Sequence, residues 1–269
     1  MKKFEVPYNF DDNFINEISK RKEYFPYIKF VYMPAFKEQN ILNTREWNNE
    51  LSKKNYSDYN LYKKTIKEFQ NLKLDVAILI QNGATLELID KYINEFNIKY
   101  FIINDDNLAK QIKEKYNNVY LILSITRILT YQEILQNDLS MYDEIVLYFW
   151  FNRHLDFIKQ LPSKYKYSIL VNCYCYYACK YAKIHWYKYR GTDISYCNST
   201  EDEYNNKNIY IKPSDLIYFD KYVNSFKLLD RIDDTESIMN ALENYINNYR
   251  KLESFEFNKD LEDYYNIKD

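Results

Sequence analysis

All four cysteines of this 269-residue chain lie between positions 173 and 197. Cys173, Cys175 and Cys179 are close together, and Cys197 follows at a distance, with His185 in between. Thiolates gathered in this way usually share a metal ion or a cluster, because one soft cation can neutralise several of them. A compact trio with a remote fourth ligand is closer to the pattern of iron–sulfur clusters than to the paired knuckles of structural zinc sites. The spacing therefore favours an iron–sulfur cluster. The alternatives are a zinc site that uses three cysteines with the fourth or with His185, and buried cysteines without a metal.

An apolar run, Tyr167–Val171, leads directly into the cysteines, and Asn172 ends it. Such a run predicts a buried strand that delivers the cysteines to one end of a sheet. His185 shares the loop with them, so it is a candidate ligand or acid/base residue, although a lone histidine is more often structural.

Strand-like apolar runs alternate with helix-like amphipathic runs along the whole chain. The predicted strands are Phe4–Val6, Lys29–Met33, Val76–Ile80, Tyr100–Ile103, Val119–Leu123, Ile145–Phe149, Ile169–Val171 and Phe226–Leu229. The predicted helices are Asp11–Lys20, Tyr59–Leu72, Thr85–Phe96, Asn107–Tyr116, Tyr131–Leu135, Leu155–Leu161 and Thr235–Leu252.

This alternation predicts an α/β fold with a parallel sheet and outer helices, and eight such units close into a TIM-like (β/α)8 barrel. The alternative is an open doubly wound sheet, which normally has fewer strands and a glycine-rich first turn. We expect one barrel domain over residues 1–252, with a cysteine-bearing insert at about 173–224 over the barrel mouth. The polar segment 37–58 is predicted to be a partly helical excursion. The polar tail 253–269 is expected to pack across the barrel or to form an oligomer contact.

In barrels of this kind the chemistry lies at the C-terminal ends of the strands. Three arginines are predicted there, Arg127, Arg153 and Arg231. Converging guanidinium groups would suit a small carboxylate-bearing donor or substrate, because they pair with carboxylates in bidentate fashion. Polar residues end most strands, however, so any one of them can simply be part of a solvated loop. The candidates for substrate binding are Arg127, Asn152, Arg153 and Asp230, and the catalytic candidates are His185, Arg231 and Asn172.

Composition excludes several classes of protein. The net charge is −2 and the basic residues are scattered, which argues against DNA binding and leaves RNA only as a transient substrate. With Gly83 and Gly191 as its two glycines, the chain cannot build a Walker or dinucleotide-binding loop. The N-terminal residues have no apolar region typical of a signal peptide, and no apolar run is long enough to span a bilayer. We therefore expect a cytoplasmic protein, in which clustered cysteines are more often metal ligands than disulfides.

Several motifs together resemble one family. They are Leu170-Val171-Asn172, Cys175-x3-Cys179-x5-His185, Tyr196-Cys197, Ile211–Leu216, Phe226–Arg231 with Thr235-Glu236, and Asn152-Arg153. The set resembles the signature of the collagenase-like peptidases of unassigned catalytic type, family thirty-two, over roughly residues 152–249. The resemblance implies a barrel and, as in several branches of the family, an oxygen-sensitive four-iron four-sulfur (4Fe-4S) cluster on four cysteines.

This sequence departs from the family pattern at one ligand position. Relatives often carry a further cysteine three or four residues after the one that matches Cys197, where this chain has Thr200 and Glu201. Cys173 is instead an additional cysteine, two residues before Cys175. The resemblance therefore implies the ligand set Cys173, Cys175, Cys179 and Cys197 if Cys173 replaces the missing cysteine, and the alternative is an incomplete cluster.

The family includes proteins associated with proteolysis and oxygen-independent hydroxylases. The hydroxylases comprise a paired ubiquinone-synthesis type and enzymes that modify RNA bases with prephenate as oxygen donor. The short single-barrel form of this chain is most similar to the ubiquinone type. The resemblance thus implies an oxygen-independent hydroxylase that acts on a small molecule or a modified base. The alternatives are a collagenase-like peptidase and a non-catalytic, cluster- or zinc-bearing subunit that pairs with a related barrel protein.

Overall fold

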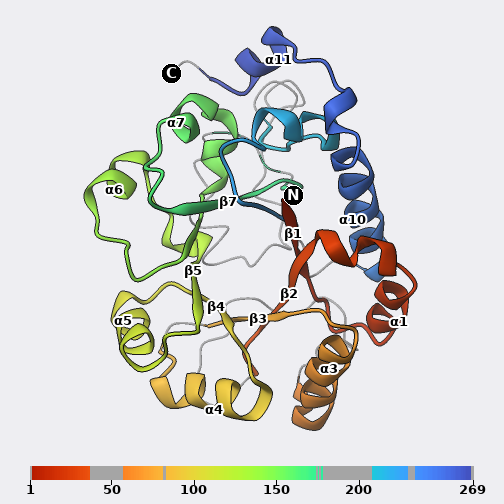
Figure 1. The fold of residues 1–269 in the computed structure, drawn as a ribbon, viewed down its shortest axis with the longest axis vertical. Helices are drawn as coiled ribbons and strands as arrows, with labels where there is room; N and C mark the ends of the chain where they lie inside the picture. Colours follow the sequence, from red (N-terminus) through yellow and green to blue (C-terminus); the bar gives the residue numbers. More distant parts are fainter. Residues whose placement is uncertain are drawn as a thin grey trace, which may run out of the picture.

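The computed structural model describes residues 2–36, 57–80, 83–173, 175, 177, 208–229 and 234–267. Eight strands pair in parallel and in chain order, and the last pairs with the first to close a barrel (Figure 1). The predicted TIM-like (β/α)8 barrel is therefore confirmed, and the open doubly wound sheet is excluded. The strands are β1 Lys3–Pro7, β2 Ile28–Pro34, β3 Val76–Leu79, β4 Tyr100–Ile103, β5 Tyr120–Leu123, β6 Glu144–Val146, β7 Lys166–Leu170 and β8 Ser225–Lys227.

Helices surround the barrel on its outside (Figure 1). The α-helices are α1 Phe14–Ser19, α3 Tyr59–Asn71, α4 Leu86–Phe96, α5 Asp106–Lys115, α6 Tyr131–Gln136, α7 Leu155–Lys159, α10 Thr235–Tyr249 and α11 Lys259–Tyr264. Short 3₁₀ helices are η1 Lys22–Tyr27, η2 Ile125–Arg127, η3 Phe149–Arg153, η6 Pro213–Tyr218 and η7 Leu252–Ser254. Within the described residues no helix is long and apolar enough to cross a membrane.

Local sequence explains where several helices begin. Asp58, Asp105 and Asp234 each cap a helix, and their side chains accept hydrogen bonds from backbone N–H groups of the first turn. Thr130 and Glu133 form a reciprocal capping box at the start of α6. The helices therefore start close to the positions that the sequence predicts.

The sixth strand is shorter than predicted. The sequence predicts a strand over Ile145–Phe149, whereas β6 ends at Val146 and η3 begins at Phe149. The chain turns into η3 here, and the Phe149 ring is buried in the apolar cluster inside the barrel. This early turn brings Asn152 and Arg153 to the barrel mouth. The predicted excursion 37–58 lies almost entirely outside the described residues.

Two apolar layers hold the barrel together. One lies between the strands and the outer helices and includes Phe4 and Val6 of β1. The other fills the barrel interior and includes Phe30, Ile102 and Leu170. The two layers follow from the alternation of side chains along each strand, which sends neighbouring residues to opposite faces.

The C-terminal tail packs on the barrel. The side chain of Tyr265 is 1% exposed, and its hydroxyl donates to Oδ2 of Asp215 at 2.7 Å. Leu155 donates its backbone N–H to the carbonyl of Tyr265 at 3.0 Å. The tail is thus anchored to both η6 and the start of α7.

Candidate functional site

The cysteine-bearing segment begins where β7 ends. Cys173 is 4% exposed and belongs to the apolar cluster that fills the barrel, together with Leu170 and Ile209. Cys175 is half-buried against the same cluster, and both residues are thiols. The strand therefore delivers two cysteines to the barrel mouth, as the sequence predicts. Of the other candidates, Cys179, His185, Cys197, Asp230 and Arg231 lie outside the described residues.

The chain returns to the mouth beside these cysteines. The N–H of Ile211 donates to the carbonyl of Val171, and the N–H of Ile209 donates to the carbonyl of Cys175, both at 3.0 Å. The two segments run antiparallel, because residue numbers rise along one and fall along the other. This backbone pairing fixes the cysteine segment against Asn208–Ile211.

Asn152 and Tyr245 lock this paired segment onto the barrel. Nδ2 of Asn152 donates to the carbonyls of Leu170 and Ile209, at 2.6 and 2.9 Å, and the residue is 1% exposed. The Tyr245 hydroxyl, from α10, lies 3.0 Å from the carbonyl oxygen of Val171 and 2.6 Å from that of Ile211. Each side chain bridges the outgoing and the returning segment. The Asn152 side chain therefore positions the two backbone segments relative to each other. Its predicted role in binding substrate stays a prediction.

Arg153 is buried and makes contacts within the protein. Its Nε donates to the carbonyl of Tyr264 at 2.9 Å, and its Nη1 donates to the carbonyl of Asn208 at 2.8 Å. Its guanidinium also lies over the Tyr264 ring, 3.9 Å from the centroid. Burial lowers the pKa of this guanidinium. The predicted role of Arg153 in substrate binding stays a prediction, and the described contacts instead join the tail to the returning segment.

Arg127 lies elsewhere on the rim. It ends η2, after β5, and its Nη2 donates to Oδ2 of Asp106 at 2.9 Å. The side chain is half-exposed, so a ligand could reach it. Asp106 also accepts a hydrogen bond from the Tyr142 hydroxyl at 2.8 Å. Arg127 and Arg153 thus bind different parts of the molecule, and their described contacts do not converge on one point.

Asn172 joins the ends of β7 and β8. Its Oδ1 accepts the backbone N–H of Leu229 at 2.6 Å, and its Nδ2 lies 3.3 Å from the Leu229 carbonyl. Asn172 and Leu229 also line a cavity of about 410 Å³ between these strand ends and α10. Polar side chains of α10, Ser237, Asn240 and Asn244, face the same cavity. A volume of this size suits a small organic molecule.

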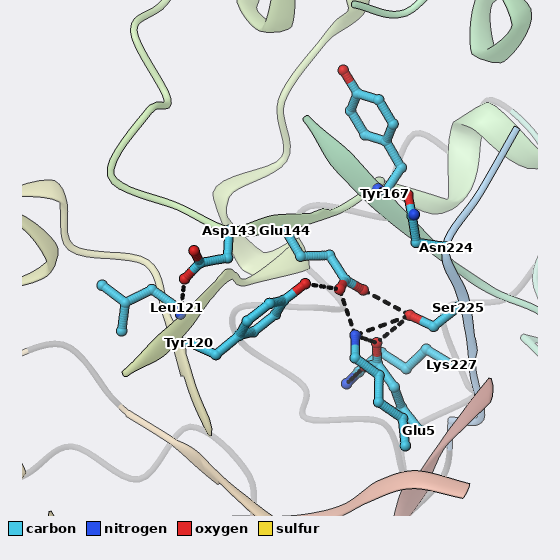
Figure 2. A network of polar contacts seen from close by, with 10 residues as sticks. Glu5, Tyr120, Leu121, Asp143, Glu144, Tyr167, Asn224, Ser225 and Lys227 are labelled. Carbon is cyan, nitrogen blue, oxygen red and sulfur yellow. Dashed lines mark hydrogen bonds and ion pairs between the residues drawn. The ribbon is translucent and has the colours of Figure 1, made fainter. Parts of the chain in front are cut away.

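A polar network occupies the barrel interior below the mouth, and sequence reasoning missed it. Figure 2 shows the Ser225 hydroxyl between the carboxylates of Glu5 and Glu144, and Lys227 beside Glu5. Nζ of Lys227 lies 2.8 Å from Oε2 of Glu5. Lys29 contacts both carboxylates, so two acidic and two basic side chains balance in charge.

Burial and charge act against each other in this network. Burial alone would raise the pKa of Glu5, but the ammonium groups of Lys227 and Lys29 and the hydrogen bonds to Lys227 and Ser225 lower it to about 2. Burial would lower the pKa of Lys29, but the carboxylates of Glu5 and Glu144 raise it. Burial also lowers the pKa of Lys227 in spite of its contact with Glu5. Each carboxylate in the network therefore has an ammonium group as its partner, and each ammonium group has a carboxylate.

The sequence contains a signal for this network. Glu5, Lys29 and Lys227 interrupt strand-like runs that are otherwise apolar or aromatic. Charged side chains at strand positions that face a barrel interior must pair, because an isolated buried charge is costly. Within the described part of the chain, no three His, Cys, Asp or Glu side chains are grouped as metal ligands.

The fold and the mouth define an eight-stranded parallel α/β barrel with cysteines at the C-terminal end of its seventh strand. No protein-family model matches the chain, and no curated protein matches its sequence. Among solved structures, the U32 peptidase Mk0906 aligns with a TM-score of 0.58 at 8% sequence identity, over 85% of this chain and 92% of that chain.

Two other solved structures align less well. A protein of Aquifex aeolicus VF5 aligns with a TM-score of 0.49 at 8% identity, over 92% of both chains. An alpha-amylase from Lactobacillus plantarum aligns with a TM-score of 0.44 at 10% identity, over 85% of this chain and 70% of its own. At these identities the comparison with the U32 peptidase supports the barrel fold alone, and the two weaker likenesses carry no argument.

Proposed function

We propose that this chain is an iron–sulfur protein related to the U32 peptidases, with a 4Fe-4S cluster held by Cys173, Cys175, Cys179 and Cys197. The position of Cys173 and Cys175 at the C-terminal end of β7 carries the proposal. Catalytic groups of α/β barrels gather at this face. The likeness in fold to a U32 peptidase agrees with the motifs that the sequence shares with that family.

Cys173 and Cys175 can supply two of the four thiolates that such a cluster needs, because soft iron ions bind deprotonated cysteines well. The backbone pairing of Cys175 with Ile209 holds the ligand segment in place before any metal binds. When bound, a cluster of this type supplies one-electron transfer at the mouth. Zinc on the same thiolates is the alternative cofactor.

We further propose that the activity is an oxygen-independent hydroxylation of a small molecule or a modified base. The cavity beside Asn172 would hold the substrate, because it opens between the strand ends that flank the cysteines. Amide groups of Asn240 and Asn244 would orient polar groups of the substrate there. Arg127 would bind a carboxylate-bearing donor in exchange for Asp106, and Arg231 and His185 stay proposed catalytic residues.

Metal analysis under anaerobic conditions tests the proposed cofactor. Full-length protein purified without oxygen is expected to contain about four iron and four acid-labile sulfide per chain. Cys173→Ser and Cys175→Ser should each lower the iron content by more than half, whereas Tyr177→Phe, at the same mouth, should leave it unchanged. Wild-type protein without iron or sulfide would overturn the proposal, and zinc alone would replace it with a structural site.

A peptidase is the second candidate, because the solved structure that aligns with a TM-score of 0.58 is that of a U32 peptidase. A peptidase needs a nucleophile with a base or a metal-bound water. Cleavage of denatured collagen that His185→Ala abolishes, in protein without iron, would favour it. Co-purification with a second barrel protein, with Arg127→Gln unimpaired, would favour a supporting subunit instead.

A further inference from the structure

The C-terminal tail forms part of the barrel mouth. Ile267 packs against the apolar cluster that contains Cys173, Tyr177 and Ile209. Its backbone N–H donates to the carbonyl of Arg153 at 2.9 Å. The last described residue of the tail therefore packs against the same apolar cluster that contains Cys173.

Several contacts hold the tail in this place. Asn266 pairs with His154 in an antiparallel bridge, and its Oδ1 accepts the N–H of Asp156 at 2.7 Å. Tyr265 is fully enclosed and is hydrogen-bonded to Asp215. The segment Asn258–Ile267 is thus tied to η6 and to the η3–α7 turn along its length.

Arg153 connects this tail to the cysteine segment. One edge of its guanidinium holds the Tyr264 carbonyl, while Nη1 holds the carbonyl of Asn208. Asn208 precedes Ile209, whose N–H donates to the carbonyl of Cys175. The buried Arg153 side chain therefore links the tail to Asn208. Asn208 is next to Ile209, which is hydrogen-bonded to Cys175.

We infer that residues 258–267 act as a strap that positions Cys173 and Cys175 through Arg153 and Ile267. Arg153 is a positioning residue in this arrangement, and the planar fork of its guanidinium is what lets it bind two carbonyls and stack on Tyr264 at once. A lysine ammonium has neither the fork nor the flat face, so it cannot make all three contacts. The relevance to a metal cofactor rests on the proposed function, but the positioning of the thiols does not.

Thiol alkylation measures the positioning directly. Full-length protein, treated with a chelator to remove metal, is reacted with iodoacetamide under native conditions, and modification of Cys173 and Cys175 is quantified separately by mass spectrometry. Arg153→Lys and Tyr264→Leu should raise the labelling rate of Cys173 by about tenfold, because the segment opens locally more often. Tyr264→Phe keeps the ring and the carbonyl, so it should label like the wild type.

Two controls separate positioning from a general loss of stability. Arg250 also donates to a carbonyl, that of Glu23, and lies over the rings of Tyr24 and Tyr27. Arg250→Lys makes the same change at an exposed arginine away from the cysteines and should not change Cys173 labelling. Phe69→Leu, on the buried face of α3, lowers stability without touching the tail.

The outcomes are distinct. Faster labelling in Arg153→Lys and Tyr264→Leu alone supports the strap, whether or not the protein binds iron. Unchanged labelling in both variants, or an equal rise in Phe69→Leu, would overturn the strap even if the iron analysis succeeds.

Discussion

Asn172, at the end of β7, is hydrogen-bonded through its amide to both backbone groups of Leu229, just beyond β8. A side-chain amide here completes the pairing of two strands after their regular ladder has ended. Its neighbour in sequence is Cys173, so the same contact fixes the place where the cysteine segment leaves the barrel.

We predict that Asn172→Ala lowers the free energy of unfolding by about 1 to 2 kcal/mol, because it leaves the N–H and carbonyl of Leu229 without their partner. Asn172→Asp should be less harmful, because a carboxylate can still accept the N–H of Leu229. Urea unfolding, followed by far-ultraviolet circular dichroism, measures both.

Asn224 offers a matched control at the opposite end of the same strands. Its Oδ1 accepts the N–H of Tyr167, at the start of β7, at 3.0 Å. Asn224→Ala should cost a similar free energy yet leave iron content unchanged, whereas Asn172→Ala should lower the iron content because it frees the segment that leads into Cys173. An equal loss of iron in both alanine variants would show that Asn172 matters only for stability.

Low pH should lower the free energy of unfolding of the barrel, because it protonates Glu5. The pKa of this carboxyl is lowered from its ordinary value of 4.5 to about 2 in the folded protein, although burial alone would raise it. A carboxyl whose pKa is lower in the folded state stabilises fully at neutral pH and loses that contribution as the pH falls from about 4.5 toward 2. The contribution at stake is up to about 3 kcal/mol.

Glu5→Gln isolates this contribution. It should be less stable than the wild type at pH 7 by about 3 kcal/mol, because Lys227 loses its closest carboxylate inside the barrel. Between pH 5 and pH 2.5 its stability should then fall less steeply than that of the wild type. Glu17→Gln, which removes partly exposed ion pairs with Lys20 and Arg21, should change little. Parallel pH curves for wild type and Glu5→Gln would contradict the assignment.

The strand order and the delivery of cysteines by β7 could be predicted because both follow from local patterns. Apolar runs of four or five residues indicate buried strands, and eight of them with intervening helices leave few ways to fold. Asp58, Asp105 and Asp234 mark helix starts through the same kind of local chemistry.

The roles of individual rim residues could not be predicted in the same way. Asn152 and Arg153 follow a strand, as binding residues often do, but their contacts with Ile209, Asn208 and Tyr264 come from segments more than fifty residues away in the sequence. The tail supplies one of those contacts, and the sequence predicts that it packs across the barrel or forms an oligomer contact but not which residues it contacts. Side-chain contacts across such distances depend on packing, which no local pattern specifies.

Asn152 carries a prediction of its own. Asn152→Ala should lower the free energy of unfolding by about 2 to 4 kcal/mol, because two buried carbonyls lose their shared donor. Asn152→Asp should be at least as harmful, since it replaces the donor with a negative charge beside those carbonyls. Urea unfolding compares them with Asn248→Ala, which removes an exposed amide from α10 and should cost less than about 0.5 kcal/mol. Equal effects at the two sites would contradict the role of Asn152 in joining Leu170 to Ile209.

Arg127 distinguishes ligand binding from stability. Its ion pair with Asp106 is half-exposed, so Arg127→Gln should change the free energy of unfolding by less than about 1 kcal/mol. Asp106 keeps its hydrogen bond from Tyr142 in the variant and stays in place.

Under the proposed function, Arg127→Gln should weaken the binding of a carboxylate donor about tenfold or more, because it removes a charge-assisted hydrogen bond. Isothermal titration calorimetry with prephenate as the probe measures this. Arg250→Gln removes an equal charge at the C-terminal end of α10 and should leave the affinity unchanged. A loss of affinity shared by both variants would indicate a general effect of charge, and an unchanged affinity in Arg127→Gln would remove this arginine from the proposed donor site.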